Sequence, residues 1–413
     1  MSTIRPFKAW RPRPDAAAEV AAKPYDVLNS DEARAEVQGH PLSFLHVGKP
    51  EVDLDPSVDL HDPRVYAKGK ENLAKLMRDG ALVEDPAPSL YVYAQTMEGR
   101  TQYGLVGCAS VEEYWNDTIR KHELTRKDKE EDRCEHVRVT NAHSGPIFLT
   151  YRDNPEVDRI VARVAAQKPA NDHVAPDGIR HQSWVISDPK DTARIVELFR
   201  AIPNLYVADG HHRSAAAGIV GRERAKANPH HRGDEEYNFF LAVCFPASQL
   251  RIFDYNRVVK DLLGMPKEKF LHRLHEEFAP VPAGGPFRPS KKGEFGMYLR
   301  GEWYHLTASE RLQRISDPVD RLDVSILQTY LLGPILGVSD PRTDKRIDFV
   351  GGMRGLGELE RRVNSGEMEV AFSLHPTSLD ELMAIADAGK IMPPKSTWFE
   401  PKLRDGLFVH FLE

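Results

Sequence analysis

The stretch from Leu205 to Val220, "LYVADGHHRSAAAGIV", places a glycine, two histidines and an arginine between an apolar run and an alanine-rich run. This order predicts a buried strand, a sharp turn and a helix that begins directly after the glycine. Backbone N–H groups at the start of a helix lack partners within the helix, and the helix dipole favours an anion there. Arginine can donate two hydrogen bonds to a phosphate, and histidine can donate one more. The predicted phosphate- or nucleotide-binding residues of this turn are Gly210, His211, His212 and Arg213.

Asp209 precedes this turn, at the end of the predicted strand. A carboxylate beside a bound anion is unfavourable unless it holds a metal ion or accepts a proton from a nucleophile. Asp209 is therefore a predicted catalytic residue and a candidate ligand for Mg²⁺. The simpler alternative is that Asp209 caps the helix and the two histidines lie on the surface. A zinc site is disfavoured, because adjacent histidines rarely bind one metal and no HxxxH or CxxC motif stands nearby.

The segment "RKHELTR", from Arg120 to Arg126, supplies a second group of candidates. Glu123 is a candidate general base or metal-binding carboxylate, and Arg120 and His122 are candidate phosphate ligands. Charge-rich segments are more often solvated loops or helix faces, and composition alone favours that alternative.

Two proline-containing loops, "KPYDV" and "PPKSTWFEPK", offer further polar groups. Loops made rigid by proline lose less entropy when they bind a ligand, although the same loops can serve as structural corners. The second loop also contains Lys402. The predicted substrate-binding residues are Tyr25, Asp26, Lys395, Ser396 and Thr397.

Several common catalytic motifs are absent from the sequence. There is no GxSxG, and none of the three cysteines stands in a positively charged, helix-starting context, so nucleophilic triads are not supported. The glycines of "GGMRGLG", from Gly351 to Gly357, lack the strand–turn–helix context of a dinucleotide-binding motif.

The elements around these residues alternate between strands and helices. A hairpin is predicted around the turn at Glu98 and Gly99, and a capped helix is predicted from Asn29 or Ser30. We therefore expect an α/β (α+β) protein with mixed sheets and flanking helices. A Pro- and Gly-rich seam from Glu276 to Gly296 predicts an N-terminal region 1–275 that carries the turn and a C-terminal region 276–413 packed against it, or one joined unit.

Composition limits the partners and the compartment. The 413 residues include 56 Lys and Arg against 62 Asp and Glu, a net charge of -6, which disfavours binding to nucleic acid. No apolar run approaches the length of a membrane span or a signal peptide, so we expect no membrane partner. Three widely spaced cysteines fit a reducing environment, and we expect a cytoplasmic protein.

The motifs "KPYDV", "RKHELTR", "VADGHHR", "MPPKSTWFEPKL" and "GLFVHF" occur in an order and spacing that resembles the domain-of-unknown-function 1015 family. The DGHHR turn also resembles the phosphate-binding strand–turn–helix of the ParB and sulfiredoxin superfamily, most closely that of its free-serine kinases. That resemblance implies a catalytic role for Asp209 and phosphate binding by Gly210, His212 and Arg213. It also implies a separate catalytic glutamate, which we assign to Glu123 from its charged surroundings. ATP or ADP with Mg²⁺ are the implied cofactors.

These observations predict nucleotide-dependent phosphoryl transfer to a small hydroxyl metabolite, with free L-serine as the acceptor. The alternatives are a phosphatase or nucleotide hydrolase that uses the same pocket, and a nucleotide-sensing module without catalysis. Sulfiredoxins carry a reactive cysteine where this sequence has His211, which argues against thiol repair. The expected partners are a nucleotide and a small substrate, with a homodimer left open.

Overall fold

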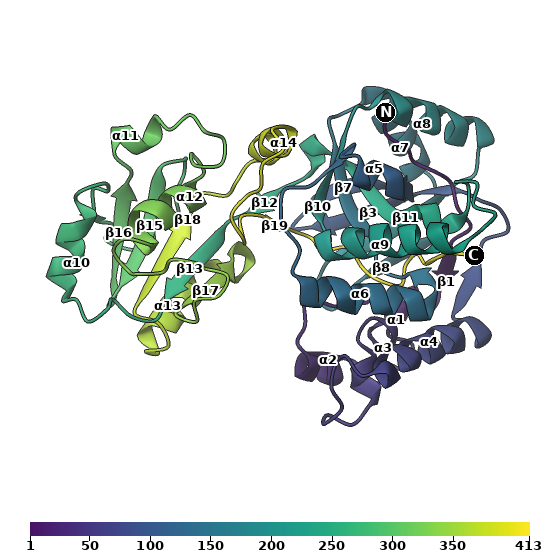
Figure 1. Cartoon of the computed structure of the whole chain (residues 1–413), viewed down its shortest axis with the longest axis horizontal. Helices are drawn as coiled ribbons and strands as arrows, with labels where there is room; N and C mark the ends of the chain where they lie inside the picture. Colours follow the sequence, from purple (N-terminus) through teal and green to yellow (C-terminus); the bar gives the residue numbers. More distant parts are fainter. The chain divides into compact units, whose positions relative to one another are not determined.

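The computed structural model describes residues 1–413, which form two compact units (Figure 1). The first unit contains Met1–Leu250 and Pro401–Glu413, and the second contains Arg251–Glu400. These boundaries differ from those of the predicted regions, 1–275 and 276–413. Strand β13 (Tyr255–Val259) pairs with two later strands of the second unit, and the end of the chain returns to the first unit. Long-range pairing rather than the Pro- and Gly-rich segment therefore defines the units.

An eight-stranded mixed sheet organises the first unit. Its order is β5-β10-β7-β11-β4-β3-β9-β8, and the pairs β5–β10 and β7–β11 are parallel while the other pairs are antiparallel. The predicted fold class, mixed sheets with flanking helices, is confirmed. The strands are β3 Leu90–Met97, β4 Arg100–Ser110, β5 Ile119–Arg120, β7 Ile147–Tyr151, β8 Asn171–Val174, β9 Arg180–Ile186, β10 Leu205–Asp209 and β11 Phe239–Pro246; β1 Trp10–Pro12 and β2 Leu82–Glu84 form a separate pair, as do β6 Ala142–His143 and β20 His410–Phe411.

Helix boundaries follow local signals in most places. Asn29 caps its helix through a reciprocal capping box, as predicted. The helix that begins at Pro189 is capped by Asp188, whose side chain accepts a hydrogen bond from the backbone N–H of Lys190. The helices of the first unit are α1 Ala17–Val20, α2 Ser30–Glu36, α3 Leu45–Gly48, α4 Pro63–Arg78, α5 Val111–Trp115, α6 Lys127–Thr140, α7 Pro155–Ala165, α8 Pro189–Ala201 and α9 His211–Ala227.

The two faces of the large sheet have different coverings. Because side chains alternate along a strand, Leu90 and Val92 of β3 point into an apolar core shared with α5, α7, α8 and α9. On the opposite face, Tyr91 and Tyr93 contact Phe408 of the C-terminal segment. Lys402 of the same segment lies 3.4 Å from Asp209, so the segment also reaches the end of β10.

Helices α6 and α9 lie side by side in the first unit (Figure 1). Ala216 and Val220 of α9 pack against Cys134 and Val137 of α6. The small side chains of the alanine-rich run let these helices approach closely.

The second unit contains a six-stranded antiparallel sheet in the order β14-β16-β15-β18-β13-β17. Helix α12 (Asp323–Leu327) continues into a π-helical turn, Gln328–Leu332. The elements of this unit are β12 Ile252–Phe253, β13, α10 Lys267–Leu274, β14 Val281–Pro282, β15 Glu294–Leu299, β16 Glu302–Thr307, α11 Glu310–Gln313, α12 Asp323–Leu327, β17 Ile347–Gly351, α13 Gly355–Asn364, β18 Val370–Leu374, α14 Leu379–Asp387 and β19 Trp398–Phe399. Neither unit has a helix long and apolar enough to cross a bilayer.

Candidate functional site

The turn between β10 and α9 has the predicted strand–turn–helix geometry. Gly210 adopts φ 93° and ψ 33°, a left-handed conformation that disfavours other residues. A Cβ atom at this position would also lie 3.2 Å from the guanidinium of Arg213. No side chain caps the helix, so the alternative that Asp209 serves as its cap does not hold. The N–H groups at the start of α9 therefore remain available to an anion.

Asp209 lies between two cations. Its Oδ2 is 3.4 Å from Nζ of Lys402 and 3.8 Å from Nη2 of Arg213. Burial acts to raise the pKa of Asp209, but the charges of Lys402 and Arg213 outweigh burial and hold this pKa below its usual value. Asp209 is thus a carboxylate, and it orients two cationic groups at the end of the strand.

Arg213 is fixed by the surrounding backbone. Its Nη1 donates a hydrogen bond of 2.8 Å to the carbonyl of Pro146 and lies 3.8 Å from Oδ1 of Asp405. Its Nε is buried and has no hydrogen-bond partner, which leaves an N–H donor for a ligand. A buried guanidinium held in one orientation is suited to recognise phosphate.

The parallel pairing of β5 with β10 brings the "RKHELTR" segment to the same place. Arg120 lies opposite Tyr206 at the end of β5, so the residues that follow run alongside the end of β10. The rings of His122 and His211 meet edge to face, with centroids 4.5 Å apart. One nitrogen of each ring and a carboxylate oxygen of Glu123 all lie within 4.8 Å of one another. Glu123 is therefore beside the turn rather than on a remote charged surface.

Burial controls the protonation of these two histidines. It lowers the pKa of His122 to about 4, although a hydrogen bond to the backbone of Val207 and the charge of Asp209 oppose this shift. Burial and the neighbouring His122 lower the pKa of His211 well below its usual value. Both rings are neutral near pH 7.

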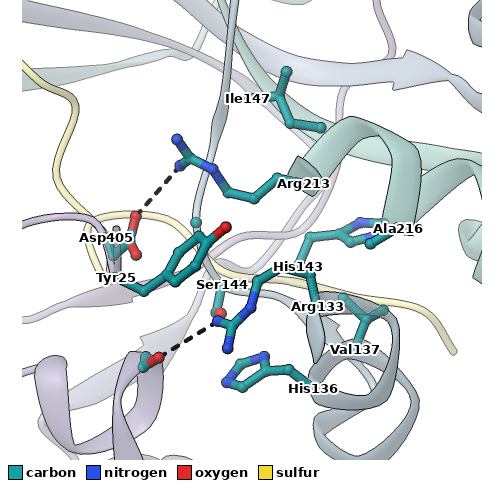
Figure 2. A pocket seen from close by; sticks show the side chains of 12 residues that line it. Tyr25, Arg133, His136, Val137, His143, Ser144, Ile147, Arg213, Ala216 and Asp405 are labelled. Atoms are coloured by element: carbon teal, nitrogen blue, oxygen red, sulfur yellow. Dashed lines mark hydrogen bonds and ion pairs between the residues drawn. The ribbon is translucent and has the colours of Figure 1, made fainter. Parts of the chain in front are cut away.

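Arg213 also lines a pocket in the first unit (Figure 2). Figure 2 shows Tyr25 between the guanidinium groups of Arg133 and Arg213, and the Arg133 guanidinium carbon is 4.0 Å from the centre of the tyrosine ring. Burial raises the pKa of Asp405 to about 7, although Arg213 opposes this shift. The lining residues are Tyr25, Gly48, Arg133, His136, Val137, His143, Ser144, Gly145, Ile147, Arg213, Ala216 and Asp405.

The remaining predicted residues have different positions. The Nε2 atom of His212 accepts a hydrogen bond of 3.0 Å from the backbone N–H of Arg126, so this ring faces the loop before α6. Asp26 is exposed, next to Tyr25 in the sequence. The structure thus collects Arg120, His122, Glu123 and Tyr25 around the DGHHR turn.

The predicted substrate residues Lys395, Ser396 and Thr397 belong to the second unit. Nζ of Lys395 lies 5.7 Å from the ring centre of Tyr255, and the hydroxyl of Ser396 donates to the carbonyl of Pro393 at 2.6 Å. Their assignment to the substrate remains a prediction.

Sequence inspection missed several polar groups of the site. The sequence predicts no role for Lys402, Arg133, His143 or Asp405, although Lys402 lies in one of the candidate loops. The only local signal for Asp405 is the following Gly406, whose φ of 84° marks a tight turn.

Comparison with protein families decides the affiliation of the chain. The family model described as "Protein of unknown function (DUF1015)" matches residues 4–325. The chain belongs to the DUF1015 family. No curated protein matches this DUF1015 chain.

Solved structures with a similar arrangement include a free serine kinase in complex with AMP. It is 14% identical to this DUF1015 chain with a TM-score of 0.36, and the match covers 72% of this chain and 89% of the kinase. A mutant free serine kinase in complex with ADP is 14% identical with a TM-score of 0.36, and the match covers 76% of this chain and 93% of that kinase. C-terminally truncated SbnI from Staphylococcus aureus is 12% identical with a TM-score of 0.38, over 74% and 87%.

Proposed function

We propose that this protein transfers a phosphoryl group from ATP or ADP to the hydroxyl of a small metabolite, with free L-serine as the acceptor. The observation that carries the proposal is the parallel pairing of β5 with β10, which brings Glu123 and Asp209 to the uncapped N-terminus of α9. The resemblance of the DGHHR turn to that of free-serine kinases supports serine as the acceptor.

The phosphate groups of the nucleotide would bind at the start of α9. The backbone N–H groups after Gly210, the Nε of Arg213 and the ammonium of Lys402 provide donors and positive charge there. Phosphoryl transfer depends mainly on positioning and on neutralising the charge of the phosphates, which this set of groups can supply.

Glu123 would accept the proton of the attacking hydroxyl, and Asp209 would hold Lys402 and Arg213 in place. The residues fit Mg²⁺ only in part. Mg²⁺ prefers oxygen ligands, and the carboxylate of Asp209 already has its charge balanced by Lys402 and Arg213. Nucleotide phosphates would therefore supply most of its ligands, with Asp209 adding one carboxylate. Bound in this way, Mg²⁺ would neutralise charge on the transferred phosphoryl group.

The test is to incubate the purified full-length chain with ATP or ADP, Mg²⁺ and L-serine and to follow O-phosphoserine by ³¹P NMR and mass spectrometry. We expect phosphoserine from the wild type and its loss in Glu123→Gln and Asp209→Asn. Asp172→Asn is a matched control, since Asp172 lies on β8 at the opposite edge of the same sheet and pairs with Arg180. This control should retain activity.

Two results would contradict the proposal. Release of inorganic phosphate without a need for serine would indicate a hydrolase. Thermal stabilisation by nucleotide that Arg213→Ala abolishes, with no turnover of any nucleotide, would indicate a sensing module.

A further inference from the structure

Two imidazoles and one carboxylate converge beside the turn from segments far apart in the sequence. His122 and His211 are buried, Glu123 is half-buried, and one ligand atom from each lies within 4.8 Å of the other two. The side chains come from the loop after β5 and from the first residue of α9. The parallel pairing of β5 with β10 makes this meeting a fixed feature of the fold.

His211 carries the second observation that points to a ligand. Only 7% of this residue is exposed, and its Nε2 atom has no hydrogen-bond partner. Buried polar atoms are satisfied in the great majority of cases, so an unsatisfied nitrogen at a cluster of metal-binding side chains requires an explanation. A bound cation provides one.

We propose that His122, Glu123 and His211 bind one divalent transition-metal ion, such as Zn²⁺ or Mn²⁺, without the help of a nucleotide. Imidazole and carboxylate are common ligands of these metals, and three protein ligands leave a position open for water or substrate. Mg²⁺ is a poorer match, because it prefers oxygen ligands. This site is distinct from the nucleotide-bound Mg²⁺ considered above.

The surroundings fit a metal centre in two further respects. The ring of His122 hydrogen-bonds to the backbone of Val207, and such outer contacts fix the orientation of metal-binding histidines. The rings of His122 and His211 also meet edge to face, with centroids 4.5 Å apart, and this contact holds both rings in place.

His212 does not belong to this cluster, although it is adjacent to His211. Its Nε2 accepts a hydrogen bond from the N–H of Arg126. The sequence argument against zinc, based on adjacent histidines, therefore does not apply, because the second imidazole comes from His122.

The metal site shares Glu123 with the proposed kinase activity, but its occupancy does not depend on that activity. A carboxylate that coordinates a metal ion is a poor proton acceptor. If the kinase proposal is correct, loading with Zn²⁺ should inhibit phosphoserine formation. Metal binding measured without nucleotide or serine tests the site separately, so the two proposals can fail independently.

The experiment uses the full-length chain after treatment with a chelator. Co²⁺ is added as a spectroscopic probe, and Zn²⁺ binding is followed by calorimetry. We expect one equivalent of metal per chain, visible d–d absorption bands with Co²⁺, and loss of both signals in Glu123→Gln and His211→Gln. His212→Gln is the matched control and should bind metal like the wild type.

The absence of stoichiometric binding by the wild type would overturn the proposal. So would binding that survives in Glu123→Gln and His211→Gln. Circular dichroism checks that each variant is folded, and Glu123→Gln decides the matter if a histidine variant does not fold, because Glu123 is half-buried and its replacement keeps the side-chain volume.

Discussion

Replacement of Asp405 by asparagine should change how the stability of the first unit depends on pH. Asp405 is 5% exposed, its Oδ1 has no hydrogen-bond partner, and Nη1 of Arg213 lies 3.8 Å away. Burial raises the pKa of this carboxyl to about 7, so ionising it in the folded protein is costly. Asparagine keeps the shape and removes the ionisation.

The magnitude follows from linkage between protonation and folding. An unfolded aspartate has a pKa of about 3.9, so the unfolded chain releases this proton more readily than the folded chain. The folded state is therefore favoured at low pH, and it loses stability as the pH rises from about 4 to about 7. At about 1.4 kcal/mol per pKa unit, the gap of about 3 units corresponds to about 4 kcal/mol as an upper figure.

Urea denaturation at a series of pH values between 4 and 8 measures this effect, with tryptophan fluorescence as the signal and two transitions fitted for the two units. We expect the free energy of unfolding of the first unit to rise in Asp405→Asn relative to the wild type as the pH increases, and the difference to level off above pH 7. Asp323→Asn is the control, since burial raises the pKa of Asp323 in the second unit to about 7 as well. Asp323→Asn should change the transition of the second unit and leave that of the first unit unchanged. Parallel pH profiles of the first transition in the wild type and in Asp405→Asn would refute the reasoning.

Two further predictions concern the phosphate-binding turn. Gly210→Ala should cost about 1 kcal/mol of stability, because the backbone is left-handed at this position. It should also weaken nucleotide binding in calorimetry, because the new Cβ would press on Arg213. The control Gly39→Ala, at φ 77° with no atom within 4 Å of the added Cβ, should show only the loss of stability. Lys402→Met should lower the rate of phosphoserine formation by about 100-fold or more, because it removes a cation beside Asp209. Lys402→Arg keeps the charge and should retain part of the rate. Equal rates in the two variants would contradict a role for this charge.

Much of the secondary structure could be predicted because its signals are local. The cap at Asn29 sits in the sequence beside the helix that it starts. The hairpin turn at Glu98 and Gly99 requires two residues with positive φ, and both adopt it. The unit boundaries could not be predicted in the same way, because they depend on which distant strands pair.

The candidate site likewise combines residues that local sequence signals predict with residues that only the tertiary fold brings together. The DGHHR turn was predictable, since its glycine, helix start and arginine are consecutive. Glu123 lies in a charge-rich segment, so its residue type alone does not mark it as a site residue. The pairing of β5 with β10 places it beside the turn. The sequence does not identify Arg133 or Asp405, apart from the glycine that follows Asp405, because each reaches the pocket through tertiary packing.

The chain order of the first unit has a consequence for biosynthesis. The second unit is inserted between Leu250 and Pro401, so the groups that balance Asp209 and Arg213 on the C-terminal segment, Lys402 and Asp405, are translated about 190 residues after the turn itself. The ribosome must complete the whole inserted unit before the turn receives these partners. A nascent chain that stops within the insertion would therefore carry the DGHHR motif without a finished pocket, which would delay ligand binding until synthesis is nearly complete.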